Sequence, residues 1–236
     1  STDNTFQVVG EWRKKDSRII YIRSEINQGI SRNYNQGLRV ARGKYVAMID
    51  DDDPWIVTDK LMRQVEFLDK NKDYVGCGAG LIVVDGGGRE LYRYLKPEKD
   101  EDIRRYILFS NPMANSTTMF RLDIAKKVNF YDESIRYAGD RDFWMKIGIE
   151  GKLYNFPEYF VRYLMTEQSK SFLFKKSQSK EILRIIRSHR KEYPNFYVAY
   201  AVNLAQYYYS FLPLGARRAS HLFLSKMKRG ISSHAI

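Results

Sequence analysis

Apolar positions along the chain follow two different periods that alternate. Continuous apolar runs, such as 45–49 and 74–84, have the length and composition of strands buried on both faces. The segments between such runs carry apolar residues three and four positions apart, as amphipathic helices do, and 30–42 is one example. Because strand and helix patterns alternate, the sequence predicts an α/β protein with a mostly parallel sheet flanked by helices.

The same criteria divide the rest of the chain. Further strands are predicted at 18–22, 90–95, 115–120 and 159–165, with a glycine hairpin turn at 86–88. Further helices are predicted after capping residues at 1–3 and 58–59, around 101–109 and 121–128, from 140 to about 151, and from 175 onward. The change to an all-helical pattern predicts two parts, an α/β domain over 1–170 and a helical extension over 171–236.

Positive charge is concentrated in that extension. Residues 170–236 hold 13 Lys and Arg but only two acidic residues, Glu181 and Glu192, which is a net charge of 13 − 2 = +11. The whole chain of 236 residues has a net charge of +12, so its first 169 residues are almost neutral. This asymmetry predicts an anionic partner for the extension, either a membrane surface, a nucleic acid or another protein.

Cysteine and histidine are too scarce for several kinds of site. The single cysteine, Cys77, excludes an internal disulfide framework and any zinc site that needs two cysteines. The three histidines all lie in the last fifth of the chain, which argues against a Ser-His-Asp or Cys-His catalytic set in the α/β domain.

Four consecutive aspartates, Asp50 to Asp53, follow the apolar run 45–49. Ligands of open α/β sheets bind beyond the carboxyl ends of the strands, and in extended chain Asp50 and Asp52 would point the same way. Crowded carboxylates repel one another unless a cation lies between them, and Mg²⁺ or Mn²⁺ commonly shares such ligands with substrate phosphates. The alternative is a solvated acidic loop, which a buried strand directly before it makes less attractive.

A second cluster of aspartates opens the helix predicted from 140. Asp140 and Asp142 are placed where the helix dipole stabilises carboxylates, while Phe143, Trp144 and Ile147 would be buried. One interpretation is an ordinary capped amphipathic helix. The functional interpretation is that one aspartate faces a cleft and acts as a general base.

Four segments in a fixed order resemble the family 2 glycosyltransferases, which have the GT-A fold. These segments are 1–5, 27–33, 43–55 and 139–144, and the resemblance covers about residues 1–170. It implies transfer of a sugar, with inversion, from a nucleotide-diphosphate sugar to an acceptor hydroxyl, with Mg²⁺ or Mn²⁺ as cofactor. A UDP-sugar donor, a glycan or lipid-linked acceptor and a role in cell-surface polysaccharide or glycan synthesis are the corresponding expectations.

The resemblance also assigns roles to residues. Asp52 is expected to bind the metal, Asp50 to lie near the ribose or the metal, and Asp140 to be the catalytic base. Three further residues are expected to have supporting roles: Asp53, Asp142 and Trp144. Residues expected to border the nucleotide or its diphosphate are Asn27, Gly29, Arg32 and Arg162.

The chain also departs from the family pattern. Family members usually begin with a strand, a helix and a second strand that ends in an Asp-Asp-Gly-Ser-like turn, and residues 1–3 resemble the end of that turn. An N-terminally truncated transferase with exposed apolar sheet edges is therefore expected, and Gly139 replaces an acidic residue common before the base. The alternative is a catalytically incomplete fragment that acts as a non-enzymatic binding or membrane-docking module.

Aromatic residues crowd the segment 193–214, which contains no charge. One interpretation is a helix that packs on the catalytic domain or on a second copy. Another is a helix in the membrane interface, with tyrosines at headgroup depth and the basic residues of 217–229 on anionic lipid, which would place the protein in the cytoplasm, peripherally at the inner face of the membrane. Nucleic acid is disfavoured because no reading motif accompanies the basic residues.

Overall fold

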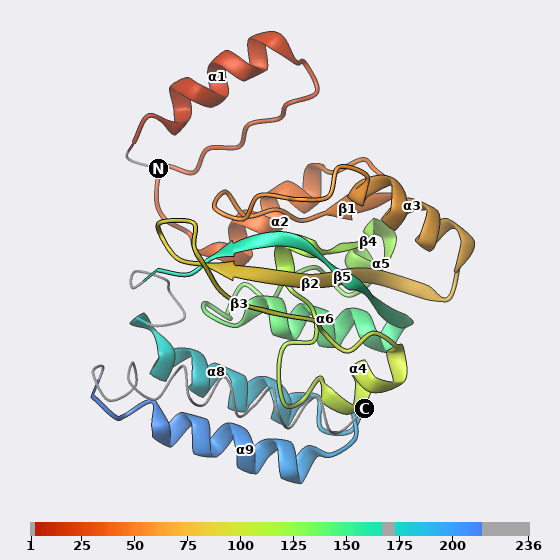
Figure 1. Cartoon of the computed structure of the whole chain (residues 1–236), viewed down its shortest axis with the longest axis vertical. Helices are drawn as coiled ribbons and strands as arrows, with labels where there is room; N and C mark the ends of the chain where they lie inside the picture. The colour runs from red at the N-terminus through yellow and green to blue at the C-terminus, as the bar shows by residue number, and fades with distance from the viewer. Residues whose placement is uncertain (1–2, 167–172, 214–236) are drawn as a thin grey trace.

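The computed structural model describes residues 3–166 and 173–213 and shows a five-stranded sheet with helices on both faces (Figure 1). The strands are β1 (Tyr45–Ala47), β2 (Tyr74–Val84), β3 (Glu90–Tyr94), β4 (Met119–Arg121) and β5 (Lys152–Leu164). The helices are α1 (Thr5–Lys15), α2 (Ile30–Val40), α3 (Lys60–Lys70), α4 (Asp100–Tyr106), η1 (Asn115–Thr117), α5 (Leu122–Lys127), α6 (Gly139–Glu150), α8 (Lys175–Ser188) and α9 (Phe196–Tyr209). The α/β architecture expected from the alternating pattern is confirmed.

The sheet is mixed. Its order is β1-β4-β2-β3, and β5 lies along the other side of β2 as a parallel neighbour. The pairs β1–β4, β2–β4 and β2–β3 are antiparallel, so β1, β2 and β5 run in one direction and the short strands β3 and β4 run against them. The predicted glycine hairpin is present between β2 and β3.

Helices cover both faces of this sheet and add a further layer on one side. In Figure 1, α2 and α3 lie above the sheet, α4 and α6 lie below it, and α8 with α9 forms a layer beneath α6. An apolar cluster joins this last layer to the domain, with Ile185, Ile186 and Ala199 packed against Ile107 and Met145. The interpretation that the aromatic segment packs on the α/β domain is confirmed for the inner face of α9.

One predicted strand is wrong. Residues 18–22 form no ladder with any described strand, and Ile20 and Ile22 are 63% and 39% exposed. A strand requires a neighbour for its backbone hydrogen bonds, and this segment instead contacts α1, with the rings of Phe6 and Tyr21 6.0 Å apart. In Figure 1, α1 and this segment stand apart from the sheet, and α1 has no buried residue.

The segment 115–120 also differs from the predicted strand. It begins as the single turn η1 and becomes strand only at β4, because the backbone N–H groups of Thr117 and Thr118 bond to the carbonyls of Ala114 and Asn115. This turn places Ser116 beside Asp50 and Asp53, and Asn115 beside Tyr34.

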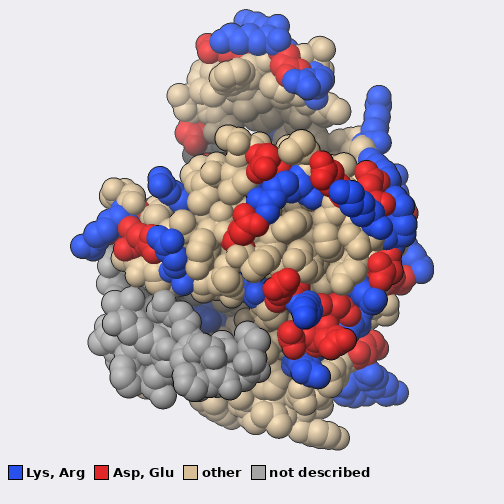
Figure 2. All heavy atoms as spheres, turned by 45° about the vertical axis from the view of Figure 1, so that its right-hand side comes forward, with Lys and Arg blue, Asp and Glu red and all other residues tan. Residues whose placement is uncertain are grey.

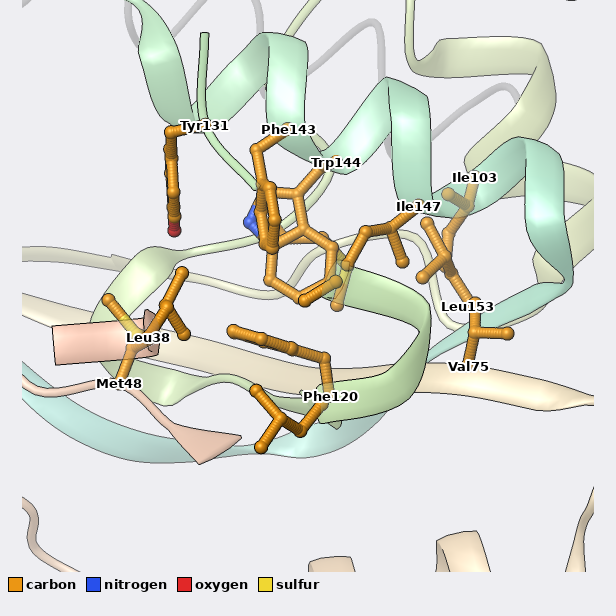
Figure 3. Packing of buried hydrophobic residues seen from close by; sticks show 13 residues of the cluster. Leu38, Met48, Val75, Ile103, Phe120, Tyr131, Phe143, Trp144, Ile147 and Leu153 are labelled. Atoms are coloured by element: carbon orange, nitrogen blue, oxygen red, sulfur yellow. The ribbon is translucent and has the colours of Figure 1, made fainter. Parts of the chain in front are cut away.

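Aromatic side chains fill the space between α6 and the sheet (Figure 3). The Phe143 ring stacks on Tyr131 with centroids 4.1 Å apart and meets Phe120 edge-on at 5.0 Å. Trp144, which was expected to have a supporting role, is fully buried beside Phe120 and belongs to this core. Its ring contributes by packing α6 against the sheet. Deleting a ring of this size from such a core costs roughly 3–5 kcal/mol.

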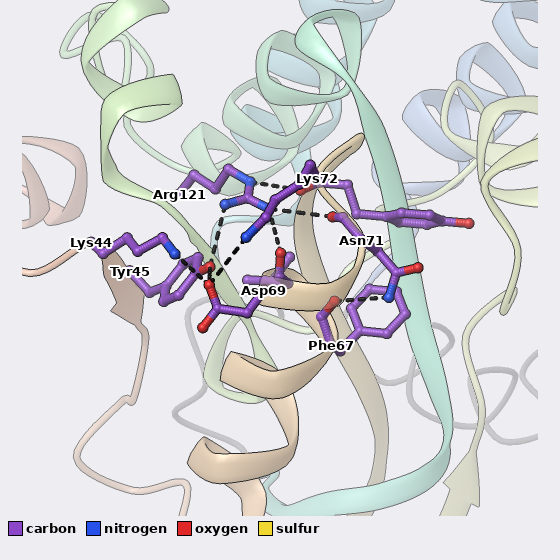
Figure 4. Close-up of polar contacts among 9 residues, drawn as sticks. Lys44, Tyr45, Phe67, Asp69, Asn71, Lys72 and Arg121 are labelled. Atoms are coloured by element: carbon purple, nitrogen blue, oxygen red, sulfur yellow. Dashed lines mark hydrogen bonds and ion pairs between the residues drawn. The ribbon is translucent and has the colours of Figure 1, made fainter.

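A buried arginine ties the end of α3 to the sheet (Figure 4). Arg121 on β4 donates to the carbonyl oxygens of Leu68, Asn71 and Tyr74, with a distance of 2.8 Å to Tyr74. These carbonyls include unpaired acceptors at the C-terminus of α3, where a positive charge is favoured by the helix dipole. Arg121 therefore fixes α3 against β2 and β4.

Lys60, the first residue of α3, is unusually deeply buried for a lysine. Its side chain is 1% exposed, donates to Gln64 Oε1 at 2.8 Å and lies 4.1 Å from the centroid of the Trp55 ring. Burial lowers the pKa of its ammonium group to about 8, from 10.5. The charged form is therefore disfavoured in the folded protein.

This burial predicts a pH-dependent effect of Lys60→Met. Because the pKa is lower in the folded than in the unfolded chain, folding stability rises with pH between about 8 and 10.5. Met has a similar length and no charge, so the variant should be more stable than wild type by roughly 1–3 kcal/mol at pH 7, and the gain should disappear near pH 10.5. Urea unfolding at both pH values measures it, with the exposed Lys70→Met as control; a gain that is independent of pH would contradict the assignment.

Candidate functional site

The aspartates after β1 form a turn. The chain keeps pairing with β4 as far as Met48, whose N–H bonds to the Thr118 carbonyl, and then turns so that the Asp53 N–H bonds to the Asp50 carbonyl at 3.2 Å. The expectation that Asp50 and Asp52 point the same way assumed extended chain, which this turn replaces. Asp50 and Asp53 face inward, and Asp52 is exposed.

Ser116 lies between the two inward aspartates. Its Oγ is 3.0 Å from Asp50 Oδ2 and 2.6 Å from Asp53 Oδ2, and it also accepts the Asp50 N–H at 3.2 Å. A hydroxyl carries one proton and can donate to only one carboxylate at a time. Burial and the charges of Asp52 and Asp50 raise the pKa of Asp53 to about 6, while the Ser116 hydrogen bond opposes that rise.

The other oxygen of Asp50 is bound by Tyr34 from α2. Tyr34 donates its hydroxyl proton to Asp50 Oδ1, and the same hydroxyl accepts from Asn115 Nδ2 at 3.1 Å. Burial, with the nearby Asp50 charge, raises the pKa of Tyr34, so the phenol stays protonated. Asp50 is therefore held rigidly by two hydroxyls, and α2 is tied to the end of β1.

A divalent cation fits this turn only with help from a substrate. The described residues contain no group of three or more His, Cys, Asp or Glu that could hold an ion by themselves. Asp50 accepts from the Tyr34 hydroxyl and contacts that of Ser116, whereas the Asp52 carboxylate is exposed beside it. Mg²⁺ and Mn²⁺ are commonly held by one or two carboxylates, with the rest of the shell from phosphates and water, and this donor set suits that arrangement with Asp52 as the principal ligand.

Asp140 lies in the first turn of α6 and is held by two donors. Its Oδ2 accepts from Asn111 Nδ2 at 2.7 Å, and its Oδ1 accepts the Arg141 backbone N–H at 2.8 Å. Burial raises the pKa of Asp140, and the Asp50 charge adds to the rise, while the Arg141 donor opposes it. A carboxylate with a raised pKa is a stronger base than an ordinary aspartate.

A single loop connects the two carboxylate groups. Asn111 donates to Asp140, and Ser116, five positions later, contacts Asp50 and Asp53. Five residues span at most about 17 Å of extended chain, so the loop limits how far apart the two groups can lie. Tyr34 and Tyr131 pack together in the same region, and burial, with the charges of both Asp50 and Asp140, raises the pKa of each phenol.

Three of the residues expected near the nucleotide meet at one hollow. Asn27, Gly29 and Arg32 line a hollow of about 260 Å³ together with residues 133–136, which precede α6. Asn27 Oδ1 accepts the Gly29 N–H at 3.0 Å, and Gly29 has a φ of +86°, which a residue with a side chain adopts only with strain. Arg32 forms an ion pair with Glu133 at 3.2 Å, so its charge is partly engaged.

The helices α2 and α6 approach closely at Gly139. A Cβ at this position would lie 2.5 Å from Ser31 Oγ, and Ser31 in turn donates to the Ile135 carbonyl at 2.9 Å. A side chain at position 139 would therefore require the Ser31 hydroxyl to turn away and give up its bond to the Ile135 carbonyl.

The remaining predicted residues lie farther from the aspartates. Arg162 is on the exposed side of β5, and its backbone N–H bonds to the Pro54 carbonyl, next to the acidic turn, at 3.1 Å. Asp142 is buried, and its Oδ1 lies 3.1 Å from His189 Nε2 at the end of α8.

The sequence reasoning missed three residues that contact the aspartates directly, Tyr34, Asn111 and Ser116, and a fourth, Asn115, that donates to the Tyr34 hydroxyl. Tyr34 occupied an apolar position of a helical pattern, and the other three stood in a segment interpreted as loop and strand. The available signal was a run of small polar residues between two buried segments, Ile107–Leu108 and Met119–Phe120.

Comparisons with known proteins point to one family. The model described as "Glycosyl transferase family 2" matches residues 1–128. An uncharacterized glycosyltransferase of Methanocaldococcus jannaschii is 28% identical over 193 residues, and one of Haemophilus influenzae is 30% identical over 208, covering 80% and 83% of this chain. The chain spans 66% and 63% of those two relatives. A shorter match, 38% identical over 72 residues and covering 30% of this chain and 28% of the relative, is to the Escherichia coli enzyme named UDP-Glc:alpha-D-GlcNAc-diphosphoundecaprenol beta-1,3-glucosyltransferase WfaP.

Solved structures share the fold. TarS of S. aureus, residues 1–349 in complex with UDP-GlcNAc, aligns with a TM-score of 0.59 at 20% identity, over 79% of this chain and 55% of that chain. A mannosyltransferase from Pyrobaculum calidifontis, in complex with GDP-Man and Mn²⁺, aligns with a TM-score of 0.60 at 14% identity, over 95% of this chain and 68% of that chain. At these identities the likeness concerns the GT-A fold.

Proposed function

Because this chain belongs to glycosyl transferase family 2, we propose that its two carboxylate groups form the active site of an inverting, metal-dependent glycosyltransferase. In this proposal the exposed Asp52 holds the cation and the donor diphosphate, Asp50 orients the turn, and Asp140 is the catalytic base. The carrying observation is the 111–116 loop, which hydrogen-bonds both to Asp140 and to the Asp50–Asp53 turn.

The chemistry follows from the position and basicity of Asp140. Its carboxylate accepts the proton of the acceptor hydroxyl while that oxygen attacks the anomeric carbon from the face opposite the leaving group. The bond from the anomeric carbon to the diphosphate oxygen breaks, and the nucleoside diphosphate leaves with that electron pair, so the configuration inverts. Asn111 keeps the base oriented, and a bound Mg²⁺ or Mn²⁺ would neutralise charge on the diphosphate.

The donor is proposed to be a nucleotide-diphosphate sugar, with UDP tested first. This choice is supported by the UDP-GlcNAc complex of TarS, by the GDP-Man complex of the mannosyltransferase and by the name of the E. coli relative. That relative's name also motivates a lipid-linked sugar as acceptor, and with such an acceptor we propose a role in cell-surface polysaccharide or glycan synthesis.

A membrane surface is the proposed partner of α9. The outer face of this helix carries no charge, and four of its exposed apolar residues are Tyr197, Val198, Val202 and Tyr208, with Tyr197 86% exposed. Figure 2 shows the lowest part of the molecule, where α9 lies, without charged side chains. No helix of the described part of the chain is long and apolar enough to cross a bilayer, so α9 would lie along the surface.

Replacing Asp52 should weaken donor binding. In calorimetry with UDP and Mn²⁺, Asp52→Ala is expected to lower the affinity at least about tenfold, because the exposed carboxylate of the turn is lost. Its exposed neighbour provides the matched control Asp51→Ala, which should retain binding. Equal affinities of Asp52→Ala and wild type would contradict the metal assignment, and a folded wild-type chain that binds no UDP, GDP or dTDP would favour the non-enzymatic alternative.

Replacing Asp140 should separate catalysis from binding. Asp140→Asn keeps the size of the side chain and removes its basicity, so transfer should fall by about 10²- to 10⁴-fold while UDP–Mn²⁺ affinity stays unchanged. The transfer rate is measured as product formation from a nucleotide sugar that the wild-type chain binds in calorimetry. The exposed Asp123→Asn is the control. Normal turnover by Asp140→Asn would exclude Asp140 as the base.

The proposed membrane contact predicts salt-sensitive binding to vesicles. The full chain should sediment with phosphatidylglycerol-containing vesicles at low salt and less at 0.5 M salt, because screening weakens the attraction of the basic extension to anionic lipid. The double change Tyr197→Ser and Tyr208→Ser should reduce binding several-fold, whereas Phe6→Ser on α1 should not. Undiminished binding by the double variant would remove α9 as the contact.

A further inference from the structure

The helix that carries Asp140 begins without a cap of its own. The N-cap position of α6 is Ala138, which makes no side-chain capping hydrogen bond. N–H groups at a helix start require acceptors, which a Ser, Thr, Asp or Asn at the N-cap usually provides. The three residues that lead into α6, 136–138, also have backbone N–H groups that need acceptors.

Glu181 on α8 supplies them. Its Oε1 accepts the backbone N–H of Arg136 at 3.0 Å, and its Oε2 accepts those of Tyr137 at 2.8 Å and Ala138 at 3.1 Å. Charge-assisted hydrogen bonds to a carboxylate are roughly twice as strong as neutral ones. One side chain, 43 to 45 positions away in sequence, thus fixes three consecutive peptides just before Asp140.

Other contacts from the helical extension reach the same segment. Gln178 Nε2 donates to the Tyr137 carbonyl at 3.2 Å, His189 lies against Asp142, and Asn203 Oδ1 accepts from Arg141 Nη1 at 3.3 Å. Polar groups of α8 and α9 therefore meet residues on both sides of Asp140. Their convergence on this short stretch is more than packing alone requires.

The charge of Glu181 makes this placement informative. It is one of two acidic residues in the strongly basic region 170–236. Its carboxylate turns inward onto backbone N–H groups, whereas the other acid, Glu192, is exposed. An acidic side chain that points inward from a basic helix indicates a specific partner. For Glu181 that partner is the backbone of residues 136–138, directly before α6.

We propose that Glu181 is a positioning residue for Asp140, through which the helical extension holds the catalytic base in place. This inference rests on the proposed function, in which Asp140 must stay within hydrogen-bond reach of the acceptor hydroxyl. A displacement of about 1 Å in such a group can cost about a hundredfold in rate. The extension therefore contributes to the proposed active site by fixing the segment that leads into α6.

The test compares Glu181→Ala and Glu181→Gln with Glu192→Gln in the full chain. Amide hydrogen exchange should accelerate about tenfold at residues 136–138 in Glu181→Ala, less in Glu181→Gln, and not in Glu192→Gln. Carbon-13 NMR of the Asp140 carboxyl should show a titration midpoint closer to that of an ordinary aspartate, because a looser segment admits water. Affinity for UDP with Mn²⁺ should stay within twofold of wild type.

Two results would overturn the proposal. One is unchanged exchange at 136–138 with an unchanged Asp140 titration. The other is a loss of protection spread evenly over the sheet and helices, which would mean that Glu181 only supports the fold. If Glu181→Ala does not fold, Glu181→Gln keeps the side-chain size and one acceptor oxygen and decides the question. A wild-type chain that binds no UDP refutes the donor assignment separately, since the exchange and titration data do not depend on nucleotide.

Discussion

The hydrogen bonds from the loop between α4 and β4 are the constraint on which the site depends. Asn111 at one end of this loop binds Asp140, and Ser116 at the other end binds Asp50 and Asp53. The loop is held in turn by η1, whose Thr117 hydroxyl accepts the Ala79 N–H of the central strand at 3.0 Å. The loop that links the two carboxylate groups is thus anchored to the central strand of the sheet.

The site also shows how one fold places nearby carboxylates in different surroundings. Asp53 is buried with a raised pKa, Asp50 contacts the hydroxyls of Tyr34 and Ser116, and Asp52 remains exposed. Tyr34, which binds Asp50, packs on Tyr131 with the two ring centroids 5.2 Å apart. Burial, aromatic packing and single hydroxyls therefore give these nearby acids, which would otherwise repel one another, different environments.

Much of this architecture could be predicted from periodicity, and much of the site could not. The glycine hairpin, the fully buried β2 and the start of α6 followed from local pattern, because apolar spacing and turn residues act over a few positions. The segment 18–22 has the pattern of a strand but no neighbour, and pairing is not encoded locally. Tyr34 and Asn111 act through partners 16 and 29 positions away, and Glu181 acts over more than 40, so no local pattern could reveal them.

The close contact between Gly139 and Ser31 has a consequence for how related sequences can vary. The two positions share one small volume, since a Cβ at 139 would collide with the Ser31 hydroxyl. A relative with an acidic residue at the first position therefore needs the serine hydroxyl to turn away, a smaller residue at the second position, or a wider separation of α2 and α6. Turning the hydroxyl away breaks its hydrogen bond to the Ile135 carbonyl, so the size of residue 139 is coupled to the way α2 is tied to the segment before α6.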